Sequence, residues 1–189
     1  LLLVGLGNPG SNYTNTRHNI GFKIIDAINA HFKLSKQKPK FKGLLTTGNI
    51  DEKKIYAIKP LTFMNNSGTA IKELIDYFKI NAKDVFVFHD DMDIDFGKIK
   101  AKFGGSSAGH NGIDSIDKFI GKDYSRVRVG IGHPKEKKKV NNHVIEVLKE
   151  DEEKKINEIT ENIVKQLPTL IEKKIDLFSS KVNQDLNGI

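Results

Sequence analysis

The chain has 189 residues, a length that suits one domain with a sizeable core, so we expect residues 1–189 to form a single domain. Its 38% hydrophobic content includes no apolar run near the roughly 20 residues of a membrane helix, and residues 1–4 are too short for a signal peptide. The absence of cysteine excludes disulfide bonds and thiolate metal sites and favours the cytoplasm. The net charge of +7 arises within residues 98–149, which contain twelve Lys and Arg and five Asp and Glu. This asymmetry favours a polyanionic partner, and a basic solvated surface is the alternative that charge alone leaves open.

Apolar periodicity predicts strands and helices that alternate along the chain. Residues 1–6 are typical of a buried strand, and the isoleucine stripe within 19–34 is typical of an amphipathic helix. The same patterns predict strands at 44–49, 55–59, 85–88 and 127–131 and helices around 71–78, 113–120 and 156–170. This alternation indicates an α/β protein.

The first turn matches a dinucleotide-binding pattern, but its context does not. Residues 5–10 read GLGNPG and follow a strand, as in G-x-G-x-x-G sites. Such sites open a helix on the third glycine, whereas Pro9 biases Asn8 toward an extended conformation and delays the helix. The acid about 20 residues further on, Asp26, lies inside the predicted helix. We therefore reject a nicotinamide cofactor.

Polar clusters follow the predicted strands or precede the predicted helices, where α/β active sites form. Taken singly, each has a simpler explanation: an asparagine can be a helix cap, a histidine can be surface decoration, and neighbouring acids can form a solvated turn. The clusters are Asn8 in GLGNPG, His18 in TRHNIGF, Asn65 in TFMNNSG, Asp90 in FHDDMD, and His110 and Asn111 in GGSSAGHNG.

Together with Tyr13 and the later RVRVGIGHP, these motifs resemble in order and spacing those of bacterial peptidyl-tRNA hydrolases. The resemblance covers essentially the entire chain and thins after about residue 150. Ser106, Ser107 and Ala108 depart from it, since glycine is more usual in that loop. The resemblance implies a metal-free, cofactor-free, monomeric enzyme with a mixed β-sheet surrounded by helices, which hydrolyses the ester bond of peptidyl-tRNA.

The resemblance also implies roles for individual residues. The catalytic histidine falls on His18 and its partner aspartate on Asp90. Side chains that contact the substrate fall on Asn8, Tyr13, Met64, Asn65 and Asn111. Two cations that bind the tRNA 5′-phosphate fall on Lys100 and Lys102, which an extended segment would place on one face. We also expect Lys135 and Lys137–Lys139 to contact the backbone of the tRNA.

These roles agree with the chemistry of an activated ester. A neutral His18 can accept a proton from the attacking water, and Asp90 on the other ring nitrogen would fix the tautomer. Uncharged amides can hold peptide carbonyls, the terminal ribose or the oxyanion, although the sequence does not assign these roles individually to Asn8, Asn65 and Asn111.

Three alternatives remain at this point. A metallohydrolase could use Asp90, Asp93, His110 or His133, although no H-E-x-x-H spacing supports it. A non-catalytic tRNA- or RNA-binding module would explain the charge but leaves His18 and Asp90 unused. A related hydrolase could act on another RNA-linked acyl ester.

Overall fold

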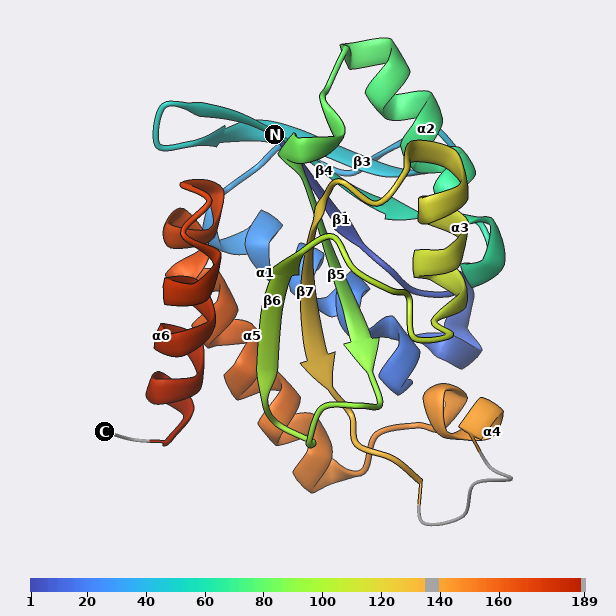
Figure 1. Ribbon diagram of the computed structural model, residues 1–189, viewed down its shortest axis with the longest axis vertical. Coiled ribbons are helices and arrows are strands. Elements are labelled where there is room, and N and C mark those ends of the chain that lie inside the picture. Colours follow the sequence, from blue (N-terminus) through green and yellow to red (C-terminus); the bar gives the residue numbers. More distant parts are fainter. Residues whose placement is uncertain (135–139, 188–189) are drawn as a thin grey trace.

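The fold is an α/β arrangement in which one mixed sheet separates two layers of helices (Figure 1). The structure is a computed structural model and describes residues 1–134 and 140–187. The strands are β1 (Leu2–Gly5), β2 (Lys38–Lys40), β3 (Gly43–Ile50), β4 (Lys53–Pro60), β5 (Val85–Asp91), β6 (Ile99–Phe103) and β7 (Ser125–Gly130). The helices are α1 (Ile20–His31), α2 (Ser67–Phe78), α3 (Asn111–Ile120), α4 (Val140–Ile145), α5 (Glu150–Ile171) and α6 (Ile175–Asn187).

The sheet order is β2-β3-β4-β1-β5-β7-β6. Strands β4, β1, β5 and β7 run parallel, whereas β2, β3 and β6 pair antiparallel with their neighbours. The fully buried apolar run of β5 suits its central position, since parallel strands are covered on both faces. The mixed sheet and the helices around it confirm the predicted fold class.

Two hydrophobic clusters fill the spaces on either side of the sheet. Helices α1, α5 and α6 pack on one face, where Ile24, Ile163 and Phe178 are buried. Helices α2 and α3 pack on the other, where Leu74 and Ile116 are buried. No helix in the described part of the chain combines the length and the apolar character needed to cross a membrane.

The sequence patterns located most elements but missed those with few apolar residues. The strand β2 is exposed throughout, and the first turn of α5 is entirely acidic, so neither carries an apolar period. The final helical region is longer than predicted, and it breaks between Ile171 and Ile175 into α5 and α6. Short 3₁₀ turns precede α1 (η2, Arg17–Asn19) and α2 (η3, Met64–Asn66) and follow β1 (η1, Ser11–Tyr13).

Helix α6 covers the edge of the sheet at β6 by direct hydrogen bonding. Asn183 accepts a hydrogen bond from the backbone N–H of Ile99 at 3.0 Å and donates to its carbonyl at 2.9 Å. One helical turn earlier, Ser179 accepts from the backbone N–H of Ala101 at 2.8 Å. These side chains satisfy backbone groups that an edge strand otherwise leaves unpaired.

Candidate active site

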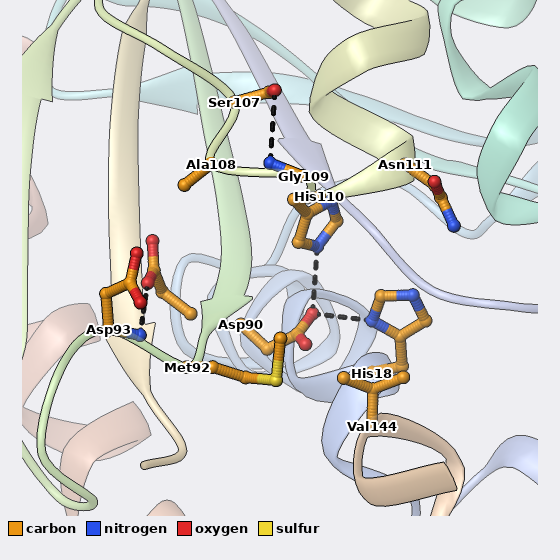
Figure 2. A pocket seen from close by; sticks show the side chains of 11 residues that line it. His18, Asp90, Met92, Asp93, Ser107, Ala108, Gly109, His110, Asn111 and Val144 are labelled. Atoms are coloured by element: carbon orange, nitrogen blue, oxygen red, sulfur yellow. Dashed lines mark hydrogen bonds and ion pairs between the residues drawn. The ribbon is translucent and has the colours of Figure 1, made fainter. Parts of the chain in front are cut away.

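A small pocket lies where the end of β5, the turn η2 and the start of α3 meet (Figure 2). Its cavity has a volume of about 90 Å³. This position at the carboxyl end of a central parallel strand is the usual place for a site in an open α/β sheet. It is lined by His18, Asp90, Asp91, Met92, Asp93, Ser107, Ala108, Gly109, His110, Asn111 and Val144.

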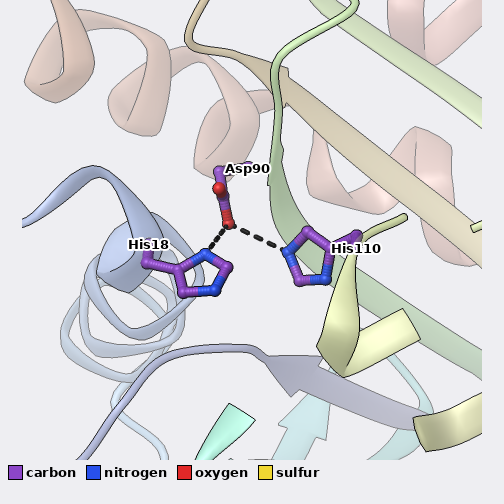
Figure 3. A group of neighbouring side chains, drawn as sticks. All are labelled: His18, Asp90 and His110. Carbon is purple, nitrogen blue, oxygen red and sulfur yellow. Dashed lines mark hydrogen bonds and ion pairs between the residues drawn. The ribbon is translucent and has the colours of Figure 1, made fainter. Parts of the chain in front are cut away.

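Two histidines converge on one carboxylate at the base of this pocket (Figure 3). Nδ1 of His18 lies 2.8 Å from Oδ1 of Asp90, and Nε2 of His110 lies 3.0 Å from the same oxygen. Asp90 is 1% exposed and His18 is 6% exposed, so bulk water does not compete for these bonds. The structure therefore joins His18 and Asp90, which are 72 residues apart, as the sequence predicted.

The protonation of His110 follows from its second role as the N-cap of α3. Its Nδ1 accepts hydrogen bonds from the backbone N–H groups of Gly112 at 3.1 Å and Ile113 at 3.3 Å. An Nδ1 that accepts carries no hydrogen, so Nε2 carries it and donates to Asp90. Sequence reasoning did not give His110 this role, although its place one residue before a predicted helix is the signal of a cap.

The same three side chains come close enough to one another to hold a metal ion. Their ligand atoms on His18, Asp90 and His110 lie within 4.8 Å of one another. However, a ligating nitrogen carries no hydrogen, and Nε2 of His110 must carry one while Nδ1 caps α3. Metal binding would thus sacrifice the cap, and these residues do not fit a metal site as they stand.

Charge and burial set the protonation states of the pair. Burial alone would raise the pKa of Asp90, but the electrostatic interactions and hydrogen bonds with His18 and His110 outweigh it and hold the pKa well below its usual range. Burial opposes protonation of His18, yet the Asp90 carboxylate and its hydrogen bond raise the pKa of His18 above its ordinary value. Asp90 is therefore a permanent anion that favours the imidazolium form of His18.

The free nitrogen of His18 is suited to act as a base. With Nδ1–H donating to Asp90, the neutral ring presents the lone pair of Nε2, which has no hydrogen-bond partner among the described residues. Figure 2 shows this nitrogen directed away from Asp90. A water molecule beside Nε2 would lose its proton to His18 as it attacked a carbonyl carbon.

The other predicted substrate-contacting residues are placed differently from one another. Asn111 lines the pocket as the first residue of α3. Asn65 is exposed on η3, and no side-chain bond caps α2, so the simpler cap explanation does not hold there. Met64, the first residue of η3, is buried and Tyr13 is half-buried on η1, and neither lines the small pocket itself.

Asn8 holds two loops of the site together. Its side-chain oxygen accepts the backbone N–H of Met64 at 2.9 Å, which ties the turn after β1 to η3. Its own backbone exchanges two hydrogen bonds with the Asn19 amide, at 2.8 and 2.9 Å. Since the Asn8 oxygen is occupied, its amide N–H groups are what remains to contact a ligand.

The predicted lysine pair lies in a different groove. Lys100 and Lys102 project from one face of β6, as the alternation predicted, and line a groove of about 550 Å³ beside α6. Arg128 of β7 lies opposite Lys100 in register and lines the same groove, a neighbour that the alternation of Arg126 and Arg128 could have revealed. The predicted contacts from Lys135 and Lys137–Lys139 lie outside the described residues.

The cations around this groove repel one another. Partial burial lowers the pKa of Lys102, and the nearby charges of Arg128 and Arg126 lower it further, against the opposing pull of Asp91. Arg128 is bound through Nε to Asp91 at 2.7 Å, which orients its guanidinium and leaves other N–H donors. An anion that bound there would relieve this repulsion.

Arg17, next to His18, fastens the segment that carries Val144 over the pocket. The guanidinium is buried and binds both oxygens of Glu152 at 2.7 and 2.8 Å. It also donates to Glu146 and to the carbonyl of His143, each at 3.3 Å. Backbone bonds between residues 15–17 and 146–148 complete the junction.

We expect Arg17→Met to destabilise the fold by about 2–3 kcal/mol, below the ~3–5 kcal/mol of a fully buried pair because Glu146 is half-exposed. Arg17→Lys should lose less stability, because it keeps the positive charge and loses only the bidentate geometry. Urea unfolding of the three proteins measures the difference. Equal unfolding midpoints for Arg17→Met and the unsubstituted chain would contradict it.

Comparison with known proteins agrees with this geometry. Residues 2–188 match the family model described as peptidyl-tRNA hydrolase. A peptidyl-tRNA hydrolase of Pelagibacter ubique is 69% identical over 183 residues, which cover 97% of this chain and 98% of that protein. One from Ehrlichia ruminantium (strain Welgevonden) is 45% identical over 96% of this chain and 93% of its own length.

A solved structure shows the same fold. The crystal structure of peptidyl-tRNA hydrolase from Acinetobacter baumannii superposes with a TM-score of 0.90 at 33% sequence identity. The match covers 96% of this chain and 93% of the crystallised one. The shared fold therefore extends over nearly the whole of both chains.

Proposed function

Because this chain belongs to the peptidyl-tRNA hydrolase family, we propose that it hydrolyses the ester bond between a peptide and the 3′-terminal ribose of tRNA. One observation carries the assignment of the catalytic groups. His18 is bound through Nδ1 to the buried anion Asp90, and its Nε2 is left available in a pocket large enough for water and a reacting group. All the proposed catalytic groups come from one copy of the chain, so a monomer is sufficient.

The proposed reaction begins with the proton transfer that His18 is placed to perform. Nε2 of His18 takes a proton from water while the water oxygen bonds to the ester carbonyl carbon. Asp90 stabilises the imidazolium that results, as the raised pKa of His18 requires. When the bond to the ribose oxygen breaks, the imidazolium returns the proton to that oxygen, and peptide acid and free tRNA result.

The uncharged amides hold the reacting group in this proposal. Asn111 faces the pocket and can donate to the carbonyl oxygen as negative charge develops on it. The N–H groups of Asn8 and the exposed amide of Asn65 are available to the ribose or to the first peptide bond. Met64 donates its backbone N–H to the Asn8 side chain, and Tyr13 forms part of the loop that follows Asn8.

No metal ion takes part in the proposed mechanism. The cap that His110 forms on α3 requires a hydrogen on Nε2, and this argues against metal-assisted hydrolysis at these side chains. The assay that tests the function is the hydrolysis of N-acetyl-aminoacyl-tRNA and of free aminoacyl-tRNA in the presence of EDTA. Fast cleavage of the acetylated substrate alone supports the proposal.

Other outcomes would favour the alternatives. Tight binding without turnover would indicate an RNA-binding module. Loss of turnover in EDTA would indicate a metallohydrolase. Turnover only with other acyl esters of RNA would indicate that the substrate is not peptidyl-tRNA.

The groove beside β6 supplies the binding site for the tRNA in this proposal. Lys100 and Lys102, with Arg128 beside them, form a cluster of cations suited to a phosphate group, and we assign to it the 5′-phosphate at the acceptor end. A phosphate held at a fixed distance from His18 would position the terminal ester in the pocket.

We expect the double variant Lys100→Ala, Lys102→Ala to raise KM for peptidyl-tRNA roughly tenfold or more, because each bond between charged groups contributes ~1.5–3 kcal/mol. Its binding should also depend less on salt. Both measurements use steady-state hydrolysis at several salt concentrations.

A substrate without its 5′-phosphate is the control. Removal of the phosphate should raise the KM of the double variant little further, since interactions with one phosphate are not additive. Lys72→Ala, Lys154→Ala removes two exposed lysines elsewhere and should behave like the unsubstituted chain. Additive losses from the variant and the missing phosphate would mean that these lysines do not bind that group.

A further inference from the structure

A buried arginine on β7 lies outside the catalytic pocket and has no role in the steps described above. Arg126 is 1% exposed, so it cannot contact a substrate. A charge inside a protein is costly to desolvate unless its donors are paired in a good geometry. Its Nε has no partner among the described residues, so the two terminal nitrogens of the guanidinium make its hydrogen bonds.

These two nitrogens of Arg126 join the segments on either side of His110. Nη1 donates to the carbonyl oxygen of Ser106, in the loop before His110, at 2.8 Å. Nη2 donates to the carboxylate of Asp117, in the helix that His110 caps, at 2.8 Å. Tyr124 supports this ion pair, since its hydroxyl donates to the same Asp117 oxygen at 2.8 Å and the guanidinium carbon lies 4.8 Å from the centroid of its ring.

Further hydrogen bonds lead through the loop from Ser106 to His110. Oγ of Ser106 accepts the backbone N–H of Ala108 at 3.2 Å, and Oγ of Ser107 accepts that of Gly109 at 3.3 Å (Figure 2). The carbonyl oxygen of Ser107 accepts the backbone N–H of His110 at 3.0 Å. Both serines stand where the resemblance to the family led us to expect glycine. Because a serine has less backbone freedom than a glycine and its hydroxyl closes a turn, this loop is held more firmly than a glycine loop would be.

We propose that Arg126 is a positioning residue of the active site, which holds the loop before His110 against α3 and so keeps His110 directed at Asp90. The bond from Nε2 of His110 is one of the two that orient the Asp90 carboxylate toward His18. If the loop and the helix moved apart, His110 could turn away and Asp90 would hold the base less accurately. A displacement of about 1 Å at a catalytic group can cost roughly 10²-fold in rate.

This inference rests on the proposed hydrolysis of peptidyl-tRNA and adds to it a residue outside the pocket. Arg126→Lys tests the geometry, because lysine keeps the charge but lacks the two arms that reach Ser106 and Asp117. We expect kcat for N-acetyl-aminoacyl-tRNA to fall roughly tenfold, the factor for one lost hydrogen bond to a charged group. KM should change little, since the positive charge near the groove beside β6 is kept.

A second measurement follows the bond between His110 and Asp90 directly. The hydrogen on Nε2 of His110 exchanges slowly with water while it is bonded to a buried carboxylate. In Arg126→Lys we expect this exchange to be roughly tenfold faster by NMR of the imidazole rings, for the same reason that kcat falls. A His110→Gln variant identifies the signal.

Two further variants keep the test informative. Ser106→Gly, Ser107→Gly breaks the path within the loop, where Ser106 is exposed, and should also speed the exchange at His110 and lower kcat. Tyr124→Phe is the matched control, because it removes one bond to Asp117 and leaves both arms of Arg126 paired. It should keep the exchange rate and the kcat of the unsubstituted chain.

Unchanged exchange at His110 in folded Arg126→Lys would overturn the inference. If that variant does not fold, the same result in Ser106→Gly, Ser107→Gly would overturn it. The proposed function fails in a different way: an unsubstituted chain that cleaves no peptidyl-tRNA would refute it, while the exchange at His110 would still test the role of Arg126.

Discussion

Replacing His18 with alanine is expected to reduce turnover of N-acetyl-aminoacyl-tRNA by ~10²–10⁴, the contribution typical of a positioned general base. The ring is held by Asp90 at 2.8 Å, and its Nε2 is the nitrogen placed to accept the proton. The groove beside β6 stays intact, and tRNA binding should survive. Single-turnover hydrolysis and filter binding measure the two quantities separately.

His31→Ala is the matched control for this variant. His31 is an exposed histidine at the end of α1, away from the pocket, and its loss should leave turnover near that of the unsubstituted chain. A folded His18→Ala protein that kept more than about a tenth of its activity would remove His18 from the mechanism.

Asp90→Asn should lower turnover on the order of 10²-fold and move the acidic limb of the pH–rate profile to lower pH. The carboxylate raises the pKa of His18, and only neutral His18 is a base, so activity falls as the pH falls through this raised pKa. Without the negative charge, burial prevails and the pKa of His18 drops, which keeps the ring neutral at lower pH.

The measurement is kcat/KM between about pH 5 and 9, since the pH dependence of this ratio reports the pKa values of groups in the free enzyme. Asp76→Asn removes an exposed acid from α2 and should leave the position of the limb unchanged. A less active Asp90→Asn protein with its limb unmoved would show that Asp90 serves catalysis in some way other than through the pKa of His18.

Local patterns were sufficient to predict most of the elements, whereas the pair at the centre of the site was predicted from the resemblance to a known family. The period of the apolar residues located α1, α2 and five of the strands, all but β2 and β6, because burial on one face determines that period. The contact of His18 with Asp90 was expected because the ordered motifs resemble those of peptidyl-tRNA hydrolases, and the residues alone did not indicate it.

Features that depend on contacts between distant segments were not predictable in this way. The role of His110 combines a helix cap, which its place before α3 signals, with a bond to a residue 20 positions earlier, which no local pattern reveals. Arg17 lies 135 residues from Glu152, and no local pattern links them. Ala108 adopts a φ of 50° in the loop where glycine is more usual, a conformation that costs an alanine roughly 1–2 kcal/mol.

The hydrogen bonds from Ser179 and Asn183 to β6 have a consequence for the chain during its synthesis. Helix α6 follows every other described element, so β6 is translated long before the residues that cover it. Until α6 docks, the outer edge of the sheet presents unpaired N–H and C=O groups to any extended segment nearby, including that of a second nascent chain. Docking of α6 therefore ends the period in which two copies can join through the β6 edge.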